Sequence, residues 1–270
     1  MINSVNSNSG SATALQSLNR TNGGLENLQN RLSTGRKVDG PKVDAATFAA
    51  AQQLLGDIGG STAVQEGLNA AEATTGVAIA AGEQVGSLLT DLRRVSVQAS
   101  QEGLDDSSRQ ALQSEFNSLR EQIGTVVGSA SFNGTNLIES GADDLDVLAD
   151  DDGGRFAVGA QDLSPAGLGI DSLSLGTAAD AASAASALDG AIATASGRLA
   201  DLGSSARRIE TQADATAVRR DSLRSGVGNL LDTDLGADAA ALAAEGVKQA
   251  LGVQALNIAN AAPRALLRLF

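Results

Sequence analysis

The sequence predicts a mainly α-helical protein, a long coiled-coil-like bundle whose N- and C-terminal helices pair, with a small β-hairpin region. Hydrophobic residues alternate at spacings of three and four in four separate stretches, which is typical of helices that pack along a seam. Aromatic residues make up only 2% of the 270 residues, and Trp and Tyr are absent. A core of Ala, Leu, Val and Ile suits helices packed side by side in a bundle.

The first predicted helix covers residues 4–33. Its apolar residues recur with a heptad-like spacing along one face: Leu15, Leu18, Leu25, Leu28 and Leu32. Gly35 fits a C-terminal cap, because glycine readily adopts the left-handed conformation that ends a helix. The loop that follows contains Gly40 and Pro41, which do not continue a helix.

The second and third predicted helices cover residues 44–100 and 105–128. Asp44 fits the N-cap of the second helix, and Asp105 or Asp106 fits that of the third. The apolar seam is expected to form the core of an outer helical bundle: Leu68, Val85, Leu88, Leu92 and Val95 in the second helix, and Leu112, Phe116, Leu119 and Ile123 in the third.

The fourth predicted helix is the longest and covers residues 178–261. Its seam belongs to the same outer core and keeps a strict spacing of four and three: Leu188, Ile192, Leu199, Leu202 and Ile209. Polar residues occupy the seam at Thr216 and Asp234, where we expect it to weaken or change partner. A helix of this length without strong breaks is typical of coiled coils and fibrous assemblies.

A small acidic region separates the third and fourth helices. Residues 144–149 and 155–160 read as two strands around a glycine-rich turn, and residues 168–175 are a candidate third strand. Residues 139–180 hold ten acids and one base, Arg155, so this segment alone carries a net charge of −9. We expect it to face solvent.

Composition excludes several classes of function. The chain contains no His and no Cys, which removes His-based acid–base catalysis, Cys nucleophiles and His/Cys zinc sites. Its net charge of −13 disfavours nucleic acid and anionic membranes as partners. No signal peptide and no run of 18 apolar residues is evident. We therefore expect no enzyme activity, no cofactor or metal, no nucleic-acid partner and no membrane insertion.

Each terminal segment carries one apolar stripe and little else. Burying a leucine stabilises by ~1.5–3 kcal/mol, whereas ordering the backbone costs about 1–2 kcal/mol per residue. We expect both termini to be poorly ordered in the monomer and to fold on assembly. The expected polymerisation interface consists of the five leucines of the first helix with Leu242, Val247, Leu251, Leu256, Ile258, Leu266, Leu267 and Leu269. Periodicity alone is equally consistent with these stripes forming an ordinary intramolecular core.

Several short motifs occur in a fixed order along nearly the whole chain. They are residues 28–37 (LQNRLSTGRK), 92–99 (LRRVSVQA), 112–115 (LQSE), 132–134 (FNG), 198–203 (RLADLG), 247–249 (VKQ) and 256–260 (LNIAN). In this order they resemble the bacterial flagellins, and most of all the short flagellins of alphaproteobacteria. The chain departs from that pattern at Asp91, where innate-receptor-binding flagellins have an arginine, and before Asp44, where a second aspartate is usual.

The resemblance implies a structural subunit that self-assembles into the helical filament used for motility. Residues 1–43 and 233–270 would form a terminal coiled-coil polymerisation domain. Residues 44–138 and 181–232 would form an outer helical bundle that carries the β-hairpin region 139–180. The protein would be secreted unfolded by type III export to an extracellular filament, with an export chaperone, the filament cap and hook-associated proteins as partners.

Two alternatives remain open from the sequence. A hook–filament junction protein of the same superfamily would share the terminal helices but assemble only over a short zone. A secreted helical adhesin would act as a monomer and keep its binding activity after loss of the first 20 residues.

Overall fold

A computed structural model describes residues 7–267, with side chains described as far as residue 261. The chain divides into two compact units. The terminal unit combines the chain up to Gly56 with the chain from Ser222 onward, and the central unit is Asp57–Asp221. Both divisions fall inside long helices, whereas the domain boundaries predicted from the sequence lie after residue 43 and before residue 233.

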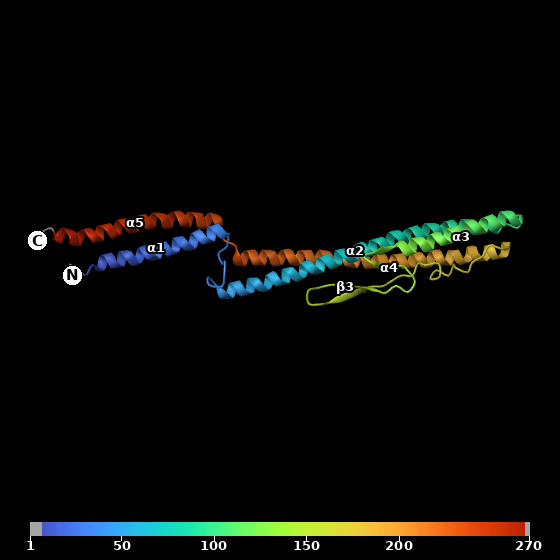
Figure 1. The fold of residues 1–270 in the computed structure, drawn as a ribbon, viewed down its shortest axis with the longest axis horizontal. Helices are drawn as coiled ribbons and strands as arrows, with labels where there is room; N and C mark the ends of the chain where they lie inside the picture. The colour runs from blue at the N-terminus through green and yellow to red at the C-terminus, as the bar shows by residue number, and fades with distance from the viewer. Residues whose placement is uncertain (1–6, 268–270) are drawn as a thin grey trace. The chain divides into compact units, whose positions relative to one another are not determined.

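The terminal unit is built from α1 (Ser9–Thr34) and α5 (Leu235–Leu267), with the first residues of α2 (Ala45–Ala99) and the last residues of α4 (Ala178–Leu231). α1 and α5 lie side by side, so the predicted pairing of the terminal helices is confirmed (Figure 1). N-terminal caps form at Asp44, whose carboxylate accepts from the backbone N–H of Thr47 at 3.1 Å, and at Asn8.

The prediction of one continuous helix over 178–261 is wrong, because the helix stops at Leu231 and restarts at Leu235. Thr233 donates its backbone N–H to the carbonyl of Gly35 at 3.1 Å instead of continuing the helical ladder. The Asp234 carboxylate then accepts from the backbone N–H groups of Gly236 and Ala237, at 2.9 and 3.0 Å, and caps α5. A polar residue on the seam thus marks a helix start.

The central unit packs α3 (Asp106–Ser129) with the adjoining parts of α2 and α4 around one apolar core. Thirteen of the fourteen residues expected in the outer core lie in or against this cluster: Leu68, Val85, Leu88, Leu92, Val95, Leu112, Phe116, Leu119, Ile123, Leu188, Ile192, Leu202 and Ile209. The fourteenth, Leu199, is half-buried and lies over Gly82.

The β region contains two separate antiparallel pairs. The predicted hairpin is β3 (Leu145–Leu148) with β4 (Arg155–Val158). A shorter pair, β1 (Ser131–Phe132) with β2 (Thr135–Asn136), was not predicted, because strands of two residues are too short to show an alternating pattern.

The third predicted strand, over 168–175, is wrong. That segment forms turns held by local backbone bonds, such as the one from the N–H of Ile170 to the carbonyl of Pro165 at 2.9 Å. Its apolar residues Leu168, Ile170 and Leu175 are buried in the central core, so the apolar character of this segment reflects burial of a loop.

Candidate assembly surface in the terminal unit

The helices α1 and α5 run antiparallel in a defined register. The Asn8 side chain donates to the carbonyl of Ala259 at 2.8 Å, and Gln249 donates to the side chain of Asn22 at 2.8 Å. Residue numbers rise on α1 as they fall on α5. Gly252 lets Leu18 approach closely, since a Cβ added there would lie 3.3 Å from a Leu18 methyl carbon.

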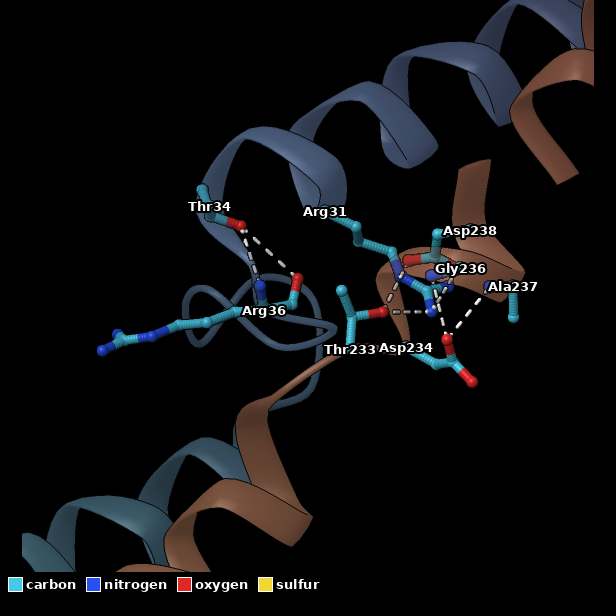
Figure 2. A network of polar contacts seen from close by, with 8 residues as sticks. All are labelled: Arg31, Thr34, Arg36, Thr233, Asp234, Gly236, Ala237 and Asp238. Atoms are coloured by element: carbon cyan, nitrogen blue, oxygen red, sulfur yellow. Dashed lines mark hydrogen bonds and ion pairs between the residues drawn. The ribbon is translucent and has the colours of Figure 1, made fainter. Parts of the chain in front are cut away.

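A polar network fixes the end of this pair next to the loops (Figure 2). Arg31 of α1 forms an ion pair with Asp238 of α5 at 2.9 Å and donates to the hydroxyl of Thr233 at 2.9 Å. That hydroxyl in turn donates to Asp238 at 2.5 Å. The Asp238 side chain is only 8% exposed and that of Arg31 is 39% exposed. A paired carboxylate this well buried specifies register, because any shift of α1 along α5 would leave it unpaired.

The two loops that enter and leave the pair are also joined. The backbone N–H of Lys37 donates to the carbonyl of Leu231 at 2.7 Å, and Arg36 forms an isolated β-bridge with Asp232. A small apolar cluster lies beneath them: Val38, Ala51 and Leu231, flanked by Phe48 and Val227. The loop that follows α1 and the loop that precedes α5 are therefore hydrogen-bonded to each other within the terminal unit.

The paired helices leave several aliphatic side chains uncovered. Among its described residues α1 has none that is buried. On α5, Val247, Leu251 and Ile258 are 61%, 63% and 65% exposed. Exposed aliphatic side chains repeated along one helix are a feature of association surfaces rather than of a finished monomer surface.

The residues expected in the polymerisation interface fall into three groups. Leu18, Leu25, Leu28, Leu32, Leu242 and Leu256 are half-buried. Leu15, Val247, Leu251 and Ile258 are exposed. Leu266 and Leu267 lie in α5 with side chains that are not described, and Leu269 lies outside the described residues.

Sequence reasoning missed two residues of this surface. Leu235 and Val253 of α5 are 53% and 46% exposed. Val253 lies off the register of the predicted seam, so the three-and-four spacing does not include it. The signal that would have found it is the high apolar content all around α5, which predicts contacts on more than one face.

Nothing in the described residues resembles a reaction centre. No group of three or more Asp or Glu side chains capable of holding a metal occurs there, and no described helix is long and apolar enough to cross a membrane. The pKa of Asp105 is lowered by hydrogen bonds from Ser107 and Ser108, and that of Asp44 by hydrogen bonds from Thr47. Both shifts come from helix capping.

Family models match most of the chain. The model of the bacterial flagellin N-terminal helical region matches residues 5–142, and that of the bacterial flagellin C-terminal helical region matches residues 185–270. The chain is 39% identical to flagellin FljM of Caulobacter vibrioides over 270 residues, which cover 100% of this chain and 99% of the relative. It is 29% identical to a flagellin of Brucella melitensis, with 99% of each chain covered.

Solved structures show the same fold. The crystal structure of Bacillus cereus flagellin aligns with a TM-score of 0.52 at 23% identity, over 56% of this chain and 88% of that chain. A structure from Vibrio parahaemolyticus assigned to a flagellar hook-associated protein aligns with a TM-score of 0.60 at 12% identity, over 70% of this chain and 100% of that chain. At these identities the likeness is one of fold alone.

Proposed function

Because the chain belongs to the bacterial flagellin family, we propose that its paired helices α1 and α5 form the surface through which it polymerises. The protein is a structural subunit that self-assembles into the helical flagellar filament and serves motility. The proposal concerns which residues carry that assembly. It assigns the role to the exposed and half-buried aliphatic residues of the two terminal helices.

The observation that carries the proposal is the exposure of Val247, Leu251 and Ile258 on α5. Full burial of such a side chain stabilises by ~1.5–3 kcal/mol, and each of these residues is more than half exposed. Each therefore offers about 1–2 kcal/mol to an association that covers it. Because a filament repeats the contact in every copy, even a modest gain per residue favours the polymer strongly.

The same balance supports the proposal that α1 and α5 are poorly ordered in the free monomer. α1 has no buried residue in its described part, so little hydrophobic free energy offsets the cost of ordering 26 residues. Contacts with further copies would supply the missing burial. The terminal unit would then fold as subunits join the filament.

The proposal gives different roles to different parts of the chain. We assign polymerisation to residues 1–43 and 233–270, and the outer helical layer to 44–138 and 181–232 with the acidic region 139–180. The central unit has its own buried core, including Leu92, Phe116 and Leu202, and does not need neighbours to bury it. That unit would remain folded while the termini order and disorder.

We also propose an export route and further partners, on the basis of family membership. The family places the protein in the extracellular flagellar filament. Secretion of the unfolded chain by the type III route, a chaperone that holds the C-terminal helix, and folding beneath a filament cap next to hook-associated proteins belong to the proposal. So does a purely structural role without enzyme activity.

The test replaces Leu251 and measures elongation from filament seeds by electron microscopy. Leu251→Asp places a charge on the exposed face and is expected to abolish elongation, while Leu251→Met, which conserves volume and apolarity, should elongate normally. The circular dichroism of both monomers should match the parent. Normal elongation by the aspartate variant would refute the assignment of this face.

A further inference from the structure

The chain contains two Asn-Gly sequences, Asn22-Gly23 in α1 and Asn133-Gly134 between β1 and β2. Asn followed by Gly is the pair most prone to cyclise, because glycine has no side chain to hinder attack by its own nitrogen. We propose that Asn133 is a site of spontaneous backbone modification in the folded protein, and that Asn22 is protected from the same reaction. The modification of Asn133 concerns the central unit alone, whereas the protection of Asn22 rests on the proposed ordering of α1 in the filament.

The turn at Asn133 has the geometry of a tight two-residue hairpin. Phe132 pairs with Thr135, so Asn133 and Gly134 alone form the turn, with φ values of 50° and 82°. Positive φ at both positions is the type I′ arrangement that Asn-Gly favours. Asn133 is exposed, and a Cβ added at Gly134 would meet nothing within 4 Å, so solvent reaches the reacting atoms.

The reaction needs only water and hydroxide. Hydroxide takes the proton of the Gly134 amide, and the nitrogen attacks the Asn133 side-chain carbonyl carbon. The side-chain nitrogen takes a proton from water, which regenerates hydroxide. The bond from the side-chain carbon to that nitrogen then breaks, ammonia leaves, and a five-membered succinimide remains. Addition of one water to either ring carbonyl opens the ring. One opening gives aspartate, and the other gives isoaspartate, whose main chain runs through the side-chain carbon.

Local opening of this turn costs little free energy. β1 and β2 contribute two residues each, and the β1 residues are exposed. A two-stranded hairpin this short has little stability of its own, so the turn reaches reactive conformations without unfolding the unit. Asn136, at the base of the hairpin, shows the contrast. It is buried, donates to the carbonyl of Val127 at 2.7 Å and accepts from Ile138 at 2.9 Å.

Asn22 lies in the middle of a 26-residue helix. In that helix the N–H of Gly23 is committed to the carbonyl four residues earlier, which removes the nucleophile. The Asn22 side-chain oxygen also accepts from Gln249 of α5 at 2.8 Å. Reaction there requires several helical turns to open together, which is far less frequent than fraying of a short hairpin.

The two products have different consequences for the turn. Aspartate preserves it, because Asp-Gly also suits a type I′ turn, and adds one negative charge. Isoaspartate adds a carbon to the main chain of a two-residue turn, so the pairing of Phe132 with Thr135 is lost. The site borders a groove lined by Phe132, Thr135, Leu145 and Arg155, so both products alter the edge of that groove.

The experiment incubates assembled filaments at mildly alkaline pH and maps both sites by peptide mass spectrometry, with fragmentation that separates aspartate from isoaspartate. The full-length chain in denaturant is the reference, where both sites should convert at similar rates. In filaments, Asn133 is expected to convert about tenfold faster than Asn22 or more, since the two differ in the cost of local opening. Asn133→Gln should remove the signal.

Two results would overturn the inference. One is a filament in which Asn133 stays intact while the denatured chain converts, which would mean that the hairpin protects it. The other is equal conversion at Asn22 and Asn133 in filaments. The Leu251 experiment measures assembly. If it fails, the comparison of Asn133 between the folded central unit and the denatured chain is unaffected.

Discussion

At the residue scale, single residues in this protein matter mainly because they fit the packed core or cap a helix. Gly82 is one such position, because a Cβ added there would lie 2.5 Å from a methyl carbon of Leu199 and 2.9 Å from one of Leu163. Leu163 is fully buried, so it has no solvent into which to move. Only the three-dimensional packing shows why no side chain is accommodated at Gly82.

Gly82→Ala is therefore expected to destabilise the central unit by about 1–3 kcal/mol, the cost typical of overpacking a filled core. Gly86→Ala, four residues along α2 with nothing within 4 Å of the added Cβ, is the matched control and should be neutral or stabilising by up to ~1 kcal/mol. Urea unfolding followed by circular dichroism measures both. Equal effects of the two substitutions would show that Gly82 is not sterically constrained.

Asp238 makes the second prediction at this scale. Asp238→Ala leaves Arg31 and Thr233 without their shared partner, which should cost about 1.5–3 kcal/mol in the assembled state and lower the melting temperature of filaments. Glu245→Ala on the same helix removes an exposed ion pair with Lys248 and should cost at most ~0.5 kcal/mol. Calorimetry of filaments of both variants provides the comparison, and equal melting temperatures would contradict the role given to Asp238.

At the scale of elements, apolar periodicity predicts where helices lie but not every place where one ends. α1, α2 and α3 lie within two residues of their predicted ends in the part of the chain described, except at the start of α1. The break between α4 and α5 was missed because its cause is pairing of Thr233 with Gly35, which are far apart in sequence. Likewise, β1 and β2 are too short for alternation to reveal them.

The candidate assembly surface was predictable in part for the same reason. Leucines on one register, such as Leu18 and Leu25, were found from spacing alone. The network around Arg31 and Asp238 was not, since nothing local in the sequence indicates that residues 207 positions apart meet. Long-range polar contacts depend on the tertiary arrangement.

The order of α1 in the monomer gives a prediction at this scale. If α1 folds only on assembly, Asn22 should convert to aspartate and isoaspartate rapidly in the dilute monomer, close to the rate in denaturant, and slowly in filaments. The hydrogen bond from Gln249 forms only when α1 and α5 pair. Peptide mapping of monomer and filament samples provides the test. Slow conversion of Asn22 in both samples would indicate a terminal unit that is already folded before assembly.

At the scale of the whole molecule, we expect charge to oppose assembly and apolar burial to drive it. Every copy carries a net charge of −13, so copies brought together in a polymer repel one another. The absence of His and Cys means that neither imidazole titration nor thiol oxidation can regulate the balance. Ionic strength is the variable that remains, because salt screens the repulsion and leaves burial of aliphatic side chains intact.

Elongation from seeds should therefore accelerate as sodium chloride rises from about 0.01 M to about 0.15 M, over which the screening length falls from ~30 Å to ~8 Å. A neutral osmolyte at matched osmolality is the control and should not reproduce the acceleration. Light scattering with seeds of fixed number gives the rate. Slower elongation at the higher salt would mean that attractive ion pairs, rather than aliphatic contacts, dominate the interface.

The central claim, that the aliphatic faces of α1 and α5 carry polymerisation, is tested most directly by an electron cryomicroscopy map of the filament that resolves side chains. Val247, Leu251 and Ile258 are expected to be buried against the terminal helices of neighbouring copies. A map in which these three residues face solvent, with subunits joined only through their central units, would contradict it.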